Sequence, residues 1–175
     1  NKLWWFLKMT EAPPTEYMVI TSHKGMRDGQ SHDGVDLRAR HGTAIKAFKS
    51  GVVFEIKRSD HPDDPSGKFV SILCDSPPEI HKYFHMSEID PRLEIGQTLF
   101  SGDQFALAGS TGNSEGPHLH FEIHRKDNNG NFVAMDPVKL YPDHFSKYMD
   151  KETGRPVNID QILKTNTRVK KSRFA

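Results

Sequence analysis

Short apolar runs, separated by clusters of glycine, proline and polar residues, follow one another along the chain from residue 17 to residue 141. The runs are 17–21, 44–57 with a turn at Ser50-Gly51, 69–74, 80–86, 104–109 and 118–124. The turn-rich clusters between them are 60–67, 75–78, 109–117 and 127–131. No part of this region keeps an apolar period of 3.6 residues long enough to predict a helix. Many short strands with close turn signals predict an all-β sheet or barrel.

The two ends of the chain differ from this middle region. We expect a lead-in segment (1–15), a main domain (16–142) and a polar C-terminal extension with a basic end (143–175). The aromatic run Leu3–Leu7 of the lead-in segment is expected to pack onto the main domain; a propeptide remnant covering a site is the alternative. Asn158 is a candidate N-cap for a short helix over 158–164. The five basic and no acidic residues from Lys164 onward predict a solvated tail or a contact with an anionic polymer.

Composition excludes several classes of function. The 175 residues are 35% hydrophobic and carry a formal net charge of +1, which argues against a nucleic-acid partner. The longest apolar stretch has five residues, whereas a membrane-spanning helix needs about 20, so no transmembrane segment is predicted. Cys74 is the only cysteine, which rules out an intrachain disulfide, and we expect a buried free thiol. The chain begins at Asn1, so we expect a processed or trimmed fragment whose signal peptide would lie upstream.

Ten histidines are the notable count, and their spacing carries the information. His32 and Asp36 both belong to residue types that bind zinc. In a straight strand, residues four apart lie about 13 Å apart, too far to share one metal ion. If they share one, the chain must bend between them, and Gly34 permits such a bend. A polar turn is the alternative interpretation of this segment.

The segment 118–124 alternates more clearly. On a strand, His118, His120 and Glu122 share one face, and the apolar residues between them share the other. The histidine face is therefore expected to line a groove, where one imidazole can bind a metal while the other contacts its water. Residues His81, Tyr83 and His85 would likewise share a face, although His85 alone also fits a structural histidine.

Together these segments resemble the lysostaphin/LytM-type zinc metallopeptidase family, which comprises glycyl-glycine and other peptidoglycan endopeptidases. The resemblance spans about 17–141. Its motifs are His32-x-Gly-x-Asp36, Gly42-Thr43-Ala44 before Gly51-Val52-Val53, Tyr83-Phe84-His85-Met86-Ser87, the segment 109–122, and the flanking Gly25, Arg27 and Asp136-Pro137. The long acidic segment 58–67, Lys24, Ala44 and Met86 depart from the family pattern, and put substrate preference rather than catalysis in question.

The resemblance implies a mostly antiparallel sheet of the lysostaphin-like, duplicated hybrid motif type, with a substrate groove between loops. It implies one Zn²⁺ held by His32, Asp36 and His120, with a fourth position open to water. His85 and His118 would be the catalytic pair. We expect His118 to orient or deprotonate the water, and His85 to stabilise the oxyanion or protonate the leaving amine, with the roles exchangeable. Glu122 is a candidate to orient one of the histidines.

The predicted function is zinc-dependent hydrolysis of peptide cross-links in bacterial peptidoglycan, outside the cytoplasm in the periplasm or the medium. The alternatives are a non-catalytic regulatory module of cell-wall enzymes and a metallopeptidase acting on a non-wall peptide. The loop 109–116 is expected to form a wall of the groove, and Asn129-Gly130 a hairpin turn. His81 is a candidate to flank the site. The remaining histidines are expected at the surface without a role: His23, His41, His61, His124 and His144.

Overall fold

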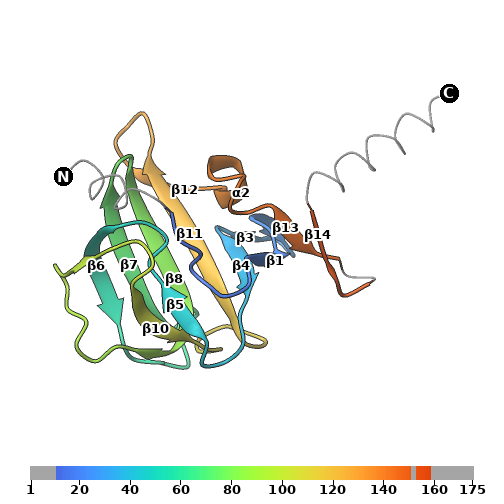
Figure 1. Cartoon of the computed structure of the whole chain (residues 1–175), viewed down its shortest axis with the longest axis horizontal. Coiled ribbons are helices and arrows are strands. Elements are labelled where there is room, and N and C mark those ends of the chain that lie inside the picture. The colour runs from blue at the N-terminus through green and yellow to red at the C-terminus, as the bar shows by residue number, and fades with distance from the viewer. Residues whose placement is uncertain (1–10, 151–152, 159–175) are drawn as a thin grey trace.

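A large, strongly twisted β-sheet forms the body of the molecule in the computed structural model, which describes residues 11–150 and 153–158 (Figure 1). Within these residues the sheet has 12 strands. Its main path runs β14 (Pro156–Asn158), β13 (Lys147–Met149), β1 (Val19–Ser22), β4 (Val35–Arg38), β11 (His118–Lys126), β8 (Pro78–Ile89), β7 (Lys68–Asp75), β6 (Gly51–Lys57) and β9 (Thr98–Leu99). Three more strands join at the sides, namely β5 (Ala44–Lys46), β10 (Gln104–Ala108) and β12 (Phe132–Met135).

The pairings within the described residues are antiparallel, except for the parallel pair β1–β13. A separate hairpin consists of β2 (Gly25–Arg27) and β3 (Gln30–His32), and the one described helix, α2, is the single turn Pro137–Leu140. The prediction of an all-β, mostly antiparallel fold is therefore confirmed. No helix of the described segments has the length and hydrophobicity needed to cross a membrane.

One face of the central strands carries the hydrophobic core. On β11 the side chains of Leu119, Phe121 and Ile123 are fully buried, and the alternation with polar residues that the sequence predicts is present. Tyr83 of β8 packs against Phe121 in this core, and its hydroxyl accepts a hydrogen bond from a backbone N–H. Burial of each large apolar side chain contributes about 1.5–3 kcal/mol, so the core holds β11 rigidly between β4 and β8. The opposite, polar face of β11 is thereby presented to solvent.

Each apolar run of the sequence contains a strand, and the predicted hairpin at Asn129-Gly130 joins β11 to β12. The hairpin β2–β3 was not predicted, because its strands are short and exposed. Its turn has two consecutive left-handed residues, Asp28 (φ 47°) and Gly29 (φ 81°), as a type I′ turn requires. The Asp-Gly pair is the signal that could have revealed this hairpin.

The C-terminal extension contributes two strands that the polar pattern of its sequence did not predict. Strand β13 pairs in parallel with β1, placing Tyr148 opposite Ile20, and β14 pairs with β13. In the lead-in segment, the backbone of Ala12 donates to Phe48 and that of Pro14 accepts from Lys46. Asn158, the expected N-cap of a helix over 158–164, is instead the last residue of strand β14. The rest of that segment, the aromatic run 3–7 and the basic tail lie outside the described residues.

Candidate active site

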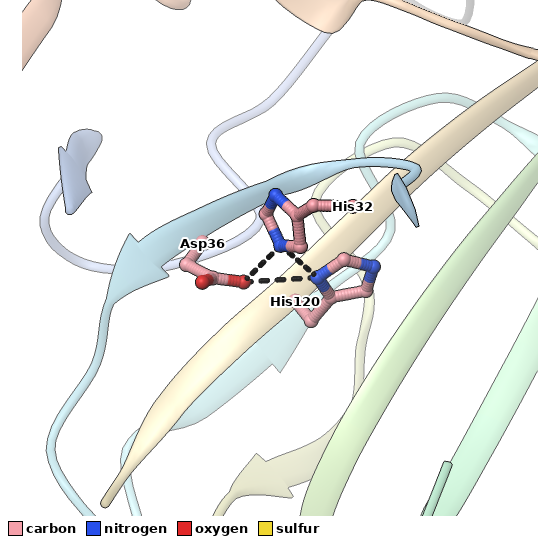
Figure 2. A group of neighbouring side chains, drawn as sticks. All are labelled: His32, Asp36 and His120. Atoms are coloured by element: carbon pink, nitrogen blue, oxygen red, sulfur yellow. Dashed lines mark hydrogen bonds and ion pairs between the residues drawn. The ribbon is translucent and has the colours of Figure 1, made fainter. Parts of the chain in front are cut away.

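Three side chains from three strands bring one atom each to a common point on the polar face of the sheet (Figure 2). The atoms are His32 Nε2, Asp36 Oδ1 and His120 Nδ1. Their separations are 3.0 Å between His32 and Asp36, 2.9 Å between His120 and Asp36, and 3.0 Å between the two histidines. All three side chains are largely buried, with 10–13% of each exposed.

The sheet register places two of these residues directly. Asp36 on β4 lies opposite His120 on β11 in the antiparallel ladder, so their side chains point to the same face at close range. His32 reaches the pair because the chain bends after β3, as the four-residue spacing demanded. Gly34 makes this bend possible by close approach: a Cβ there would lie 2.2 Å from the backbone oxygen of Phe121.

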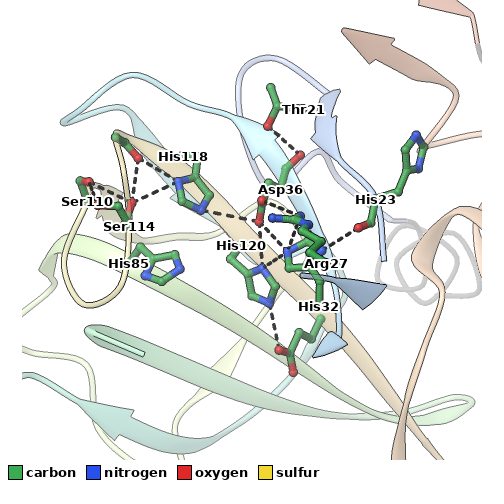
Figure 3. A network of polar contacts seen from close by, with 12 residues as sticks. Thr21, His23, Arg27, His32, Asp36, His85, Ser110, Ser114, His118 and His120 are labelled. Atoms are coloured by element: carbon green, nitrogen blue, oxygen red, sulfur yellow. Dashed lines mark hydrogen bonds and ion pairs between the residues drawn. The ribbon is translucent and has the colours of Figure 1, made fainter. Parts of the chain in front are cut away.

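Hydrogen bonds to neighbouring residues hold each of the three side chains in place (Figure 3). Nε2–H of His120 donates to Glu122 Oε1 at 2.9 Å, the contact predicted for Glu122. Nδ1 of His32 lies 2.7 Å from the backbone oxygen of His23, to which it donates in the tautomer that leaves Nε2 unprotonated. The Arg27 guanidinium also contacts this ring, at 2.7 Å from Nδ1 and 3.0 Å from Nε2. The Arg27 guanidinium donates to the other oxygen of Asp36 at 3.1 Å. Since each second atom is engaged, His32 Nε2 and His120 Nδ1 are the ring nitrogens that point to the common centre, where they would offer their lone pairs to a metal ion.

Electrostatics of the cluster favour a cation at its centre. Burial alone would raise the pKa of the Asp36 carboxyl, but hydrogen bonds from His120 and His32 hold it far below its usual range. Burial would likewise lower the pKa of His120, yet its hydrogen bonds to Asp36 and Glu122 raise it to about 9. The two carboxylates thus favour positive charge at His120, and a metal ion bound there would replace the proton on Nδ1.

Two further histidines stand beside this cluster with their outer nitrogens turned towards it. Nδ1–H of His118 donates to Gly116 O at 2.8 Å, and Nδ1–H of His85 donates to Thr111 O at 2.7 Å. Each neutral ring therefore keeps its proton on Nδ1 and leaves the lone pair of Nε2 free. His118 Nε2 lies 3.6 Å from Asp36 Oδ1. The ring centroids of His85 and His118 are 4.8 Å apart. Burial and the neighbouring histidines lower the pKa of His85 to about 4.

The position of His85 corrects one expectation. Strict alternation would put His81, Tyr83 and His85 on one face, but the structure buries His81 and Tyr83 in the core and turns His85 to the polar face. The cause is a β-bulge. His85 has a left-handed φ of 64°, and the register between β7 and β8 shifts at this point. A bulge re-aims the side chain that it carries, which the period of the sequence cannot reveal.

The five residues line a groove of about 910 Å³ on the polar face. One wall is formed by the hairpin β2–β3 and the other by the loop 113–117, as expected for the glycine-rich segment. The long acidic segment braces that second wall: Pro65 O accepts from Asn113 N at 2.9 Å, and Asp60 Oδ1 accepts from Gly112 N at 3.0 Å. The departure of segment 58–67 from the family pattern therefore acts on the shape of the groove.

The family model of peptidase family M23 matches residues 30–136, more than half of the chain. The chain belongs to peptidase family M23. The predicted resemblance to lysostaphin and LytM-type metallopeptidases is thereby confirmed at the level of the family.

Individual relatives agree with this assignment. The chain is 34% identical over 109 residues to an uncharacterized metalloprotease of Haemophilus influenzae, covering 62% of this chain and 21% of that protein. It is 32% identical over 92 residues to the peptidoglycan DD-endopeptidase ShyA of Vibrio cholerae, covering 53% and 20%. The lysostaphin catalytic domain of Staphylococcus simulans superposes with a TM-score of 0.54 at 24% identity, covering 78% and 95%, which shows the shared fold. The aligned part spans about a fifth of both sequence relatives.

The donor set of this M23 chain fits zinc. Two imidazole nitrogens and one carboxylate oxygen are a common ligand set for catalytic zinc, which keeps its fourth position open. Zn–N and Zn–O bonds of about 2.0–2.1 Å in tetrahedral geometry separate the ligand atoms by roughly 3.3 Å. The observed separations of 2.9–3.0 Å are close to that value, and the engaged outer atoms fix the tautomers that ligation needs.

The other histidines of the M23 chain are distributed differently from the expectation. His81 does not flank the site: it is fully buried on the core face, where Nε2–H donates to Glu79 at 2.6 Å and Cys74 Sγ lies 3.7 Å from Nδ1. His124 is not surface decoration, because Nε2–H donates to the free oxygen of Glu122 at 2.6 Å. His23 is exposed at the surface as expected, although its ring stacks on Tyr148.

The remaining three histidines differ in how exposed they are. The ring of His144 packs edge-on against Phe48 in a half-buried position, contrary to expectation. His41 and His61 are exposed as expected. Cys74 is a buried free thiol, as predicted, and burial raises its pKa to about 12.

Proposed function

We propose that this protein is a zinc-dependent endopeptidase that hydrolyses peptide cross-links of bacterial peptidoglycan. His32, Asp36 and His120 hold one Zn²⁺, and His85 and His118 are the catalytic residues. The observation that carries this proposal is the convergence of three donor atoms within 3.0 Å of one another, beside two histidines whose Nε2 lone pairs face the same groove.

Zinc, when bound, supplies a Lewis acid that polarises the scissile carbonyl and lowers the pKa of a water. Side chains of the protein then have to take one proton from this water and pass it to the leaving amine. His118 is placed to take it, because its Nδ1 proton is committed to Gly116 O and its Nε2 lies 3.6 Å from the ligand atom Asp36 Oδ1. We assign the removal of the water proton to His118 Nε2.

His85 acts on the oxyanion and on the leaving amine. Its pKa of about 4 keeps the ring neutral near pH 7, so its Nε2 can donate only a proton that it gains during turnover. The oxygen of the water joins the carbonyl carbon, the C–N bond breaks, and the proton taken from the water passes to the leaving amine. The short separation of the two rings suits this transfer, with the imidazolium stabilising the oxyanion on the way.

Family membership, together with relatives such as ShyA, a peptidoglycan DD-endopeptidase, supports this substrate class. Both D-Ala–diaminopimelate cross-links and Gly-Gly bridges suit an open groove of this size. A substrate in the cell wall requires action outside the cytoplasm, in the periplasm or the medium.

Purified sacculi with direct and with glycine-bridged cross-links test this proposal. After incubation, mass spectrometry of the released muropeptides identifies the bond that is cut and the new amine termini. Asp36→Ala should release nothing, whereas the matched control Asp63→Ala, which removes an exposed carboxylate, should cleave like the wild type. Stoichiometric zinc without new termini from either wall would contradict the proposal and favour a regulatory module. Cleavage of a non-wall peptide alone would favour the third alternative.

A further inference from the structure

The hairpin β2–β3 carries His32 but is poorly anchored by burial. Every residue of its two strands is exposed apart from the half-buried His32. Its two strands pair with each other in a sheet separate from the main one. The position of this ligand therefore depends on a few specific contacts rather than on a hydrophobic face.

Two of these contacts are ion pairs at the groove. Arg27 meets Asp36 at 3.1 Å, and Lys24 meets Asp33 at 3.5 Å. The Arg27 guanidinium is 43% exposed and Asp33 is 47% exposed, whereas their partners Asp36 and Lys24 are 13% and 24% exposed, so water partly screens each pair. Ion pairs open to solvent contribute about 0–1 kcal/mol each.

Two further contacts reach the His32 ring itself: the Arg27 guanidinium lies 2.7 Å from Nδ1 and 3.0 Å from Nε2, and a backbone oxygen lies 2.7 Å from Nδ1. The backbone oxygen of His23, in the turn between β1 and β2, accepts the Nδ1 proton of His32 at 2.7 Å. The ring of His23 stacks on Tyr148 with a centroid distance of 4.7 Å and an interplanar angle of 22°. Tyr148 is itself fixed on β13 by its register opposite Ile20 of β1. Figure 3 shows the chain of contacts from His23 to His32 and Asp36.

We infer that Tyr148 is a positioning residue of the metal centre. By stacking on His23 it fixes the carbonyl that orients His32 and keeps its proton on Nδ1, which leaves Nε2 free to ligate. Outer partners of this kind typically change metal affinity 10–100-fold when they are lost. The inference rests on the proposed zinc site, and it makes the C-terminal extension, which follows the matched residues 30–136, a working part of that site.

Zinc affinity, measured by competition with a chromophoric chelator, tests the inference without relying on turnover. Tyr148→Ala should weaken zinc binding about 10-fold, while Tyr148→Phe, which keeps the stacked ring, should stay within about twofold of the wild type. Lys147→Ala removes an exposed neighbour on the same strand and should also leave the affinity unchanged. Thermal unfolding of the metal-free variants separates loss of the strand from loss of positioning.

His23→Ala tests the same stack without changing β13, and a double-mutant cycle with Tyr148→Ala measures whether the two residues act together. His23→Ala removes the other partner of the stack, so it should weaken zinc binding as much as Tyr148→Ala does, and the double variant should lose no more than either single variant. Equal losses in Tyr148→Phe and Tyr148→Ala, additive losses in the cycle, or wild-type affinity in Tyr148→Ala would overturn the inference. A wild-type protein that binds no zinc would overturn the proposed site as well, so the two failures are distinguishable.

Discussion

Two histidine–carboxylate clusters lie on opposite faces of the sheet, with His120 of one and Arg125 of the other on the two faces of β11. The groove cluster contains His32, Asp36 and His120. The buried cluster centres on Glu79, which is fully enclosed and accepts hydrogen bonds from His81 at 2.6 Å and Arg125 at 2.7 Å. The hydroxyl of Tyr141 and the ammonium of Lys49 complete the buried cluster.

The two clusters differ in how far nearby cations balance the negative charge of their carboxylates. Around Glu79, the guanidinium of Arg125 and the ammonium of Lys49 balance the carboxylate, and burial together with these cations lowers the pKa of His81. In the groove, two carboxylates flank His120 and raise its pKa to about 9. A histidine beside a carboxylate therefore does not by itself predict a metal site. In the groove, two carboxylates are balanced only in part by Arg27, and three donor atoms converge, which supports the proposed zinc site.

The largest effect is expected for His120→Ala. Losing a ligand should release the zinc and remove several kcal/mol of transition-state stabilisation, so cleavage should fall by about 10³-fold or more. Zinc content and muropeptide release measure both. The matched control His61→Ala removes an exposed histidine and should be silent. Cleavage at the native rate by His120→Ala would show that the groove cluster is no more required for activity than the buried cluster.

His118→Ala should lower kcat by about 10²–10⁴-fold while stoichiometric zinc is retained, because it removes a proton acceptor and no ligand. Steady-state kinetics on a cross-linked muropeptide and metal analysis of the same sample test this. Loss of zinc together with activity would instead assign His118 to the ligand set.

Glu79→Gln should act on stability alone. Breaking a buried ion pair leaves its cations uncompensated and costs about 3–5 kcal/mol. Urea unfolding of the metal-free protein measures the loss, and chelator competition should find zinc affinity unchanged. A large fall in zinc affinity in the folded variant would show that the two clusters are coupled through β11.

The same carboxylate predicts an acid dependence of stability. Burial would raise the pKa of Glu79, but the hydrogen bonds and charges of His81 and Arg125 lower it from 4.5 to about 2. Because the folded-state pKa is depressed, the stabilisation is present above the unfolded value and is lost as the pH falls from 4.5 towards 2, by about 3 kcal/mol in all. The stability difference between wild type and Glu79→Gln should shrink by this amount over that range. A difference that does not vary with pH would contradict the ionised state of Glu79.

Glu122→Gln should have the smallest effect, weakening zinc binding about 10–100-fold. Glu122 touches His120 and His124 but is not itself a ligand in this proposal. Chelator competition measures the change, with His124→Ala expected to weaken binding less. Complete loss of zinc would make Glu122 a ligand.

Much of the fold and of the candidate site could be predicted from local pattern. Apolar runs marked the strands, and the spacing of His118, His120 and Glu122 put them on one face, because the period of two is a property of a single strand. The short exposed strands of the β2–β3 hairpin and the polar strands β13 and β14 could not be found this way. Their pairing depends on neighbours far along the chain.

The sequence by itself determined the all-β class, the M23-type motifs and the apolar face of β11. Only the tertiary structure decided which histidines serve the groove. A bulge on β8 turns His85 away from His81 and Tyr83, and the close approach of Gly34 to Phe121 brings His32 to Asp36. The packing of β13 beside β1 then sets Tyr148 against His23. The physical reason is that alternation is local, whereas charge compensation and access to a groove depend on which strands are neighbours in the folded sheet.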